Sequence, residues 1–148
     1  MSLEKWAEYG WLRAEPTSPE EIAGLLGIVS RDLDDARVEA ISEDRRFEAA
    51  FNAVRTAANV VLRAHGYRTA TQLGHHLKTI ESLELTIQAD PRLVQKLRVF
   101  SKKRNATSYD SAGNVSDQEL EEVIRIADEL LRTVAAWLRE NHPELLKG

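Results

Sequence analysis

The segment SDQELEEVIRIADELLRTVAAWLREN, residues 116–141, decides the fold class because it is the clearest helix in the sequence. Ser116 followed by Glu119 is the pattern of a capping box, in which each side chain binds a backbone N–H at the helix start. Apolar residues then recur every three or four positions, namely Leu120, Val123, Ile124, Ala127, Leu131, Val134 and Leu138. This spacing predicts one apolar face, and Pro143 ends the helix near residues 141–143.

The same signals recur upstream and predict further helices. Residues 18–40 begin with a serine N-cap, a proline and a glutamate, and then carry an apolar stripe that extends to Ala36. Residues 42–65 keep that spacing until a glycine at position 66, and residues 91–104 repeat it behind an Asp-Pro start. The less regular stretch from 71 to about 87 predicts one shorter helix. No segment alternates with a period of two residues, so no strand is predicted.

Helices with one apolar stripe each, joined by short connections, bury those stripes against one another. We therefore predict an all-α fold, an antiparallel up-and-down bundle of four to five helices. The length of 148 residues fits a single domain, 1–148, with the bundle in 18–141 and an N-terminal aromatic arm in 1–17. Trp6, Tyr9 and Trp11 of the arm predict that it docks on its own bundle or contacts a second copy.

The composition excludes several classes of protein. There is no cysteine, which rules out disulfides, thiolate metal sites and cysteine nucleophiles. The first ten residues contain Glu4 and Glu8 where a signal peptide needs an apolar core, and no stretch approaches the roughly 18 apolar residues of a membrane span. We expect a cytoplasmic protein with no membrane contact. His75 and His76 point about 100° apart on a helix, so we predict no metal site and no cofactor.

One segment is strongly basic although the net charge of the chain is −4. Between Pro91 and Tyr109 there is no acidic residue, and the basic residues are Arg92, Lys96, Arg98, Lys102, Lys103 and Arg104. Local cation density favours binding of a polyanion, because bound phosphates release counterions. The alternative is a solvated helix face whose lysines pair with acids elsewhere in the fold.

Arg104 differs from its basic neighbours in its position on the helix. Phe100 follows Leu97 by three positions, and Arg104 follows Phe100 by four. Arg104 therefore continues the apolar stripe of the helix and should point inward. A guanidinium there has either a structural role, capping carbonyls or pairing with Asp34 or Asp35, or a phosphate-binding role in a cleft.

The helix that carries Asp34 and Asp35 has further acids. Asp32 and Glu39 join them, and we assign all four carboxylates to a solvated helix face.

The residues after Arg104 carry a family resemblance. The motif RNATSY at 104–109 lies at the end of a penultimate helix, before a long final one. It resembles the signature of HEPN domains, the higher eukaryotes and prokaryotes nucleotide-binding superfamily. SPEEIAGLL…RDLDDA in the first long helix and FEAAFNAVRTAANVVLRAHGYR in the second are similar to the small stand-alone bacterial and archaeal branch. The resemblance covers roughly residues 18 to 140.

The resemblance implies a homodimer in which two copies of the motif face each other across a cleft. In ribonuclease members an arginine is followed, after four to six residues, by a histidine, and the pair cleaves RNA without a metal. Arg104 matches that arginine and Asn105 the polar residue after it, whereas Tyr109 stands in the place of the histidine. A tyrosine near pKa 10 is a poor base at neutral pH, so cleavage should be weakened or lost.

The resemblance therefore implies binding of RNA or nucleotide phosphate, in a toxin-antitoxin or defence setting. The implied binding residues are Arg98, Lys102, Lys103, Arg104, Asn105 and Ser108, with Arg104 and Tyr109 catalytic if any activity remains. One alternative is a metal-independent endoribonuclease that uses Arg104 with Tyr109. Another is a non-catalytic module that partners a minimal nucleotidyltransferase, with Tyr109 as the modified residue.

Overall fold

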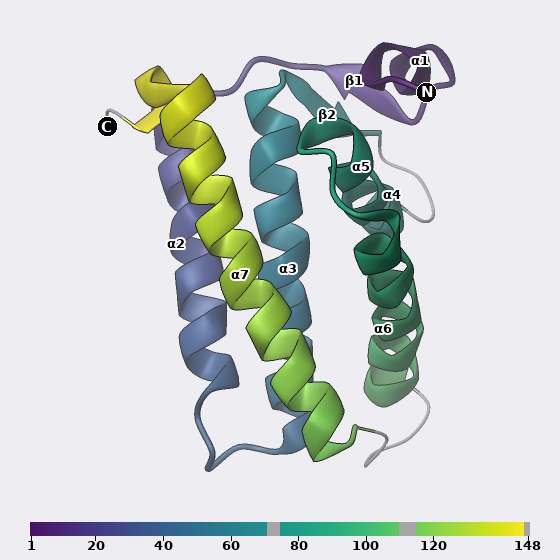
Figure 1. Cartoon of the computed structure of the whole chain (residues 1–148), viewed down its shortest axis with the longest axis vertical. Coiled ribbons are helices and arrows are strands. Elements are labelled where there is room, and N and C mark those ends of the chain that lie inside the picture. The colour runs from purple at the N-terminus through teal and green to yellow at the C-terminus, as the bar shows by residue number, and fades with distance from the viewer. Residues whose placement is uncertain (71–74, 110–114, 147–148) are drawn as a thin grey trace.

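The chain is mostly helical, which confirms the predicted all-α class (Figure 1). In the computed structural model, the backbone is described for residues 1–70, 75–109 and 115–146, and side chains are described there except at 75 and 106–109. The elements are α1 (Leu3–Glu8), β1 (Leu12–Ala14), α2 (Pro19–Ala36), α3 (Glu43–Ala64), β2 (Tyr67–Thr69), α4 (His75–Glu81), α5 (Leu83–Thr86), α6 (Pro91–Tyr109), α7 (Asp117–Asn141) and the short 3-10 helix η1 (Pro143–Leu146). Within these residues, no helix has the length and apolar content needed to cross a membrane.

Three of the long helices begin at a serine N-cap, and the sequence predicts those at Ser18 and Ser116. The hydroxyls of Ser18, Ser42 and Ser116 each accept a hydrogen bond from the backbone N–H three residues later, at 3.1 to 3.2 Å. At α7 the capping box is complete, because the Glu119 carboxylate also accepts from the Ser116 N–H. At the end of α3, Gly66 has a φ of +88°, a conformation that favours glycine.

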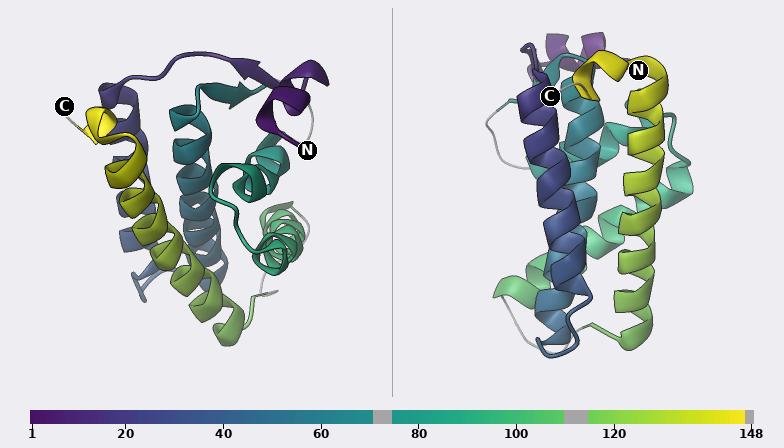
Figure 2. Two further views of the ribbon diagram at one scale, coloured as in Figure 1. Left: turned by 45° about the horizontal axis from the view of Figure 1, so that its top comes forward. Right: turned by 90° about the vertical axis from the view of Figure 1, so that its left-hand side faces the viewer.

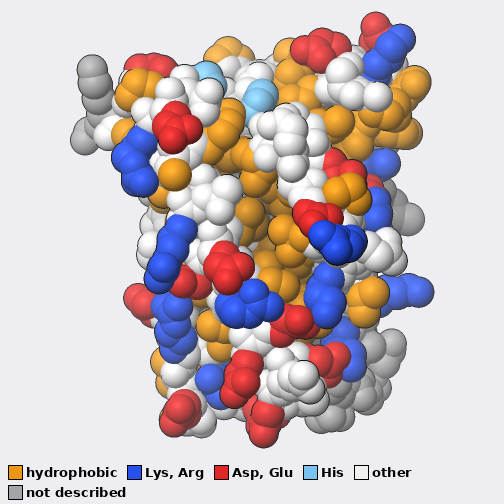
Figure 3. Space-filling model, viewed as in Figure 1, with side chains coloured by type: hydrophobic (Ala, Val, Ile, Leu, Met, Phe, Trp, Pro, Cys, Tyr) orange, Lys and Arg blue, Asp and Glu red, His pale blue; other side chains and the backbone are white. Residues whose placement is uncertain are grey.

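The central helix of the fold is α3. α2 and α6 lie on either side of it, α7 packs across α2 and α3, and consecutive long helices run in opposite directions (Figures 1 and 2). The apolar stripe of α3 is buried in this core, together with those of α2, α6 and α7. α7 and α6 are not parallel in the view of Figure 1. Hydrophobic side chains are visible on the molecular surface between these two helices (Figure 3).

The N-terminal arm docks on its own chain. Trp6 of α1 is 7% exposed and clusters with Leu12 and Leu62, and the Lys78 ammonium lies 3.7 Å from the ring centroid of Trp11. Tyr9, by contrast, is 53% exposed. Large aromatic rings gain most from burial, which explains why the arm folds back.

The prediction that the chain has no strand is wrong. β1 of the arm pairs antiparallel with β2, with Leu12 opposite Thr69 and Ala14 opposite Tyr67. Strands of three residues are too short to show an alternating pattern in the sequence.

The arm is also fastened by a buried arginine of α3. Arg63 is 2% exposed. It donates two hydrogen bonds to the Glu21 carboxylate, at 2.9 and 3.1 Å, and others to the carbonyls of Glu15, Pro16 and Tyr67. Its charge and its donors are thus satisfied inside the fold, as a buried guanidinium requires.

The helix predicted over 71–87 forms as two shorter ones. Residues 71–74 lie outside the described part, and α4 and α5 are separated at Ser82. The Ser82 hydroxyl donates to the Thr79 carbonyl at 2.6 Å, a local bond that competes with regular helix geometry. Ile80 of α4 and Leu83 of α5 are both buried.

Candidate functional site

Most of the basic residues of this segment form ion pairs with acidic side chains of the same chain. The pairs are Arg92 with Asp90 at 3.0 Å, Lys96 with Glu122 at 3.1 Å, Arg98 with Glu81 at 2.9 Å and Lys103 with Glu119 at 3.1 Å. Lys96, Arg98 and Lys103 therefore follow the alternative in which the basic face pairs with acids elsewhere in the fold, whereas Arg92 pairs locally with the residue before its helix. Lys102, which is exposed, and Arg104 have no ion pair with any described residue.

Arg104 points inward, as its spacing from Leu97 and Phe100 predicts. Its half-buried side chain lines a pocket of about 340 Å³ between α2, α3 and α6. The other lining residues are Asp32, Arg45, Glu48, Ala49 and Asn52. The Arg104 Nε is buried and has no hydrogen-bond partner among the described residues. A buried donor in this state is uncommon in folded proteins.

The acids of α2 do not all lie on a solvated face, which corrects our assignment of Asp32. This residue is 5% exposed, because the helix turns it toward α3 while Asp34 and Asp35 remain exposed. The exposed positions of Asp34 and Asp35 also argue against their proposed pairing with Arg104.

Asp32 starts a hydrogen-bonded chain that leads along α3. One carboxylate oxygen accepts from Arg31 at 3.1 Å, and the other accepts from the amide of Asn52. The amide oxygen of Asn52 in turn accepts from the guanidinium of Arg55. The carboxylate of Asp32 is therefore already bound by Arg31 and Asn52.

The electrostatic environment of Arg55 shows an excess of positive charge. Burial and then the neighbouring Arg104 hold the pKa of Arg55 below its ordinary value, with Asp32 opposing the shift. The guanidinium of Arg104 is thus close enough to disfavour the charged form of Arg55. An anion bound near them would relieve that repulsion.

Sequence reasoning missed the polar face of α3. Arg45, Glu48, Asn52, Arg55 and Asn59 are spaced three or four residues apart, so they share one side of the helix. The apolar stripe of the same helix occupies the other side. The sequence prediction for this helix was based on that stripe alone. The signal that could have revealed the site is this second periodicity on a helix that is central to the fold.

The remaining predicted residues follow Arg104 on α6. Asn105 is exposed. The backbone of Ser108 and Tyr109 belongs to α6, whereas their side chains lie outside the described residues. The structure thus brings Arg104 together with Arg45, Asn52 and Asp32, and not with Arg98 or Lys103.

Comparison of the chain with models of known protein families, with curated proteins and with solved structures finds no match. The HEPN resemblance therefore stays a prediction from the sequence motifs. In the described part of the chain, no group of three or more potential metal-ligating side chains lies together.

Proposed function

We propose that the chain binds the phosphate groups of RNA or of a nucleotide through Arg104, in the pocket between α2, α3 and α6. The observation that carries this proposal is the buried Nε of Arg104, which has no partner among the described residues. Leaving a buried donor unsatisfied costs about 1–3 kcal/mol. A phosphate oxygen is an acceptor that matches the planar fork of a guanidinium, so a bound phosphate would remove this cost.

Neighbouring residues support an anionic ligand. Arg45 lines the same pocket and Arg55 is close enough to feel the charge of Arg104. Asn52 adds an amide to the lining of the pocket. The carboxylates of Asp32 and Glu48 also line the pocket, and the described contacts of Asp32 are with Arg31 and Asn52 and not with Arg104.

The sequence resemblance supplies the wider part of the proposal. In it, the chain is a HEPN-like bundle that forms a homodimer, and the Arg104 pockets of the two copies share one cleft. Tyr109 in place of the histidine leaves phosphate binding as the main activity, with RNA cleavage weakened or absent. A toxin-antitoxin or defence role follows from the same resemblance.

The test is RNA affinity as a function of salt, measured by fluorescence anisotropy with a labelled single-stranded oligonucleotide. The variants are Arg104→Met and, as a control that removes one charge from the same helix, Arg98→Met. Arg98 is paired with Glu81, which also contacts Lys78 at 3.6 Å, so the control leaves that acid with a partner.

We expect Arg104→Met to weaken binding and to reduce the slope of log affinity against log salt by about one, as for one lost phosphate contact. Arg98→Met should bind nearly as well as the wild type. Equal losses in both variants, or a wild-type affinity that does not change with salt, would contradict the proposal.

A further inference from the structure

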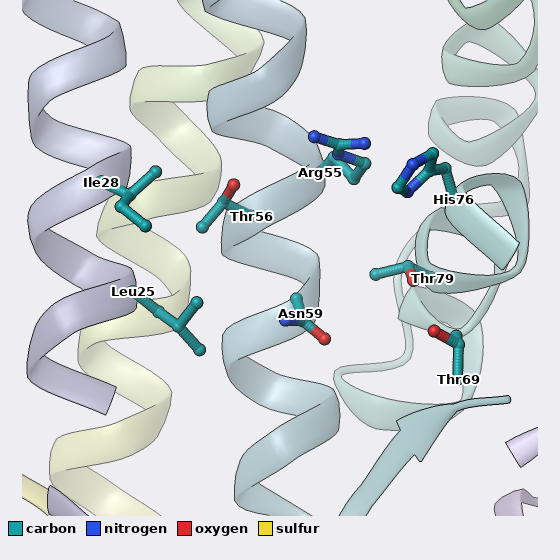
Figure 4. A pocket seen from close by; sticks show the side chains of 8 residues that line it. All are labelled: Leu25, Ile28, Arg55, Thr56, Asn59, Thr69, His76 and Thr79. Carbon is teal, nitrogen blue, oxygen red and sulfur yellow. The ribbon is translucent and has the colours of Figure 1, made fainter. Parts of the chain in front are cut away.

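A second pocket lies further along the polar face of α3, at residues 55–59, whereas the Arg104 pocket lies at residues 45–52. It has a volume of about 250 Å³ and lies between α2, α3 and α4 (Figure 4). Arg55 from α3 and His76 from α4 face each other across it, and Asn59 and Thr79 lie on the same two helices beside them. α7 passes behind α2 and α3 in this view, so the pocket is on the side of α3 turned away from α7.

The charge of this pocket is one-sided. Among the described residues that line it there is a guanidinium and an imidazole but no carboxylate. The guanidinium of Arg55 has five N–H donors. Within the described part of the chain it gives one hydrogen bond, to Asn52, so most of its donors remain for a ligand. Asn59 and Thr56 add uncharged polar groups from the same helix.

The electrostatics favour an anion at Arg55 specifically. Burial and the charge of Arg104 both lower the pKa of Arg55, which means that its charged form is under-stabilised in the folded chain. Asp32 partly offsets this effect, but its carboxylate is bound by Arg31 and Asn52. A negative ligand at Arg55 would complete the stabilisation of the guanidinium.

The opposite wall of the pocket is apolar. Leu25 and Ile28 of α2 line it with half-buried side chains. Sites for small molecules combine an apolar wall with a few convergent polar groups, and they usually have volumes of about 300–1,000 Å³ for ligands of drug size. The smaller volume here fits a ligand with no more than a single ring beyond its charged group.

We propose that this pocket binds a small organic anion, whose phosphate or carboxylate group lies at Arg55 and whose neutral part contacts Leu25 and Ile28. The site goes beyond the proposed binding of RNA at Arg104, because its polar groups come from α3, α4 and Thr69 of β2 and its ligand is a small molecule. Phosphate and carboxylate share the same recognition by a guanidinium fork, and the experiment distinguishes them.

The experiment is isothermal titration calorimetry of the full chain with four probes. Phenyl phosphate and benzoate carry the two anionic groups on the same ring, inorganic phosphate lacks the ring, and benzyl alcohol lacks the charge. We expect saturable binding of phenyl phosphate or benzoate, weaker binding of inorganic phosphate and none of benzyl alcohol. Which of the two ring anions binds tighter identifies the preferred group.

Two variants locate the binding. Arg55→Gln should lower the affinity for the anion about tenfold or more, as expected for the loss of a charge-assisted hydrogen bond. Arg125→Gln, which removes one exposed guanidinium from α7 outside both pockets, is the matched control and should leave the affinity unchanged. Leu25→Glu keeps Arg55 and places a carboxylate in the pocket wall, so it should also abolish binding.

The proposal is overturned if neither ring anion binds at about 10 mM, a concentration at which even a weak specific site is occupied. It is equally overturned if Arg55→Gln or Leu25→Glu binds the probe as well as the wild type. Far-ultraviolet circular dichroism of each variant checks that it is folded. RNA binding through Arg104 is measured in the separate anisotropy assay. A negative result at one site therefore does not change the conclusion drawn for the other.

Discussion

Two arginines point into this fold, and we predict that the same substitution has opposite effects on them. Arg63 is 2% exposed and its hydrogen bonds reach the Glu21 carboxylate and three backbone carbonyls. Arg104 is half-buried, and its Nε has no partner among the described residues. Methionine removes the charge and the donors from each site while it keeps much of the side-chain volume.

The expected magnitudes follow from these contacts. Arg63→Met leaves a partly buried carboxylate and several carbonyls without their donor, which should lower the free energy of unfolding by about 3–5 kcal/mol. For a chain of this length each kcal/mol shifts Tm by roughly 2–4 °C, so Tm should fall by roughly 6–20 °C. Arg104→Met removes an unsatisfied buried donor and should raise the free energy of unfolding by about 1 kcal/mol.

The assay is urea denaturation at neutral pH, followed by circular dichroism, with a thermal melt of the same samples. Arg92→Met serves as the exposed control, because its ion pair with Asp90 lies on the surface and such pairs contribute little. If Arg104→Met lowers stability by more than about 1 kcal/mol, the guanidinium supports the fold and the reasoning about its missing partner is refuted.

Three further predictions concern the fold. Trp6→Ala should lower the free energy of unfolding by about 3 kcal/mol in urea denaturation, because the indole that anchors the arm is buried; a loss near zero would show that the arm does not contribute. Ser116→Ala removes the N-cap of α7 and should cost about 1 kcal/mol in the same assay, whereas an unchanged urea midpoint would contradict the capping argument. Burial opposes the ionisation of Glu21, but hydrogen bonds from Thr17 and Arg63 outweigh it and hold its pKa below the ordinary 4.5. Because the pKa of Glu21 is lower in the folded state, its ionised carboxylate stabilises the fold above the unfolded pKa, and this stabilisation is lost as the pH falls. The urea midpoint should therefore decrease as the pH is lowered from about 5 to about 3, and it should decrease less in Glu21→Gln. An identical pH profile in the variant would refute this.

The long helices could be predicted from the sequence because their signals are local. The serines at positions 18, 42 and 116 are N-caps, and the apolar stripes behind them are long enough to be unambiguous. The pairing of β1 with β2 could not be predicted, since it joins two three-residue segments far apart in the chain. The break at Ser82 was missed because the apolar spacing continues across it from Ile80 to Leu83.

The candidate site was predictable only in part. The inward position of Arg104 followed from helical spacing and is confirmed by its place in the pocket. The partners of that pocket come from α2 and α3, and which side of each helix faces α6 depends on tertiary packing. This is why Asp32 was assigned to solvent and why Asn52 and Arg55 were not recognised. The pairing of Arg98 and Lys103 with distant acids depends on packing in the same way.

The most direct test of phosphate binding at Arg104 is a nuclear magnetic resonance titration of the arginine Nε–H signals with a short RNA oligonucleotide. The Arg104 signal is assigned by its loss in Arg104→Met, and the signal of the satisfied Arg63 serves as an internal control. We predict that the Arg104 Nε–H resonance shifts on addition of RNA while that of Arg63 stays in place. An Arg104 resonance that does not move while other signals show bound RNA would contradict the central claim.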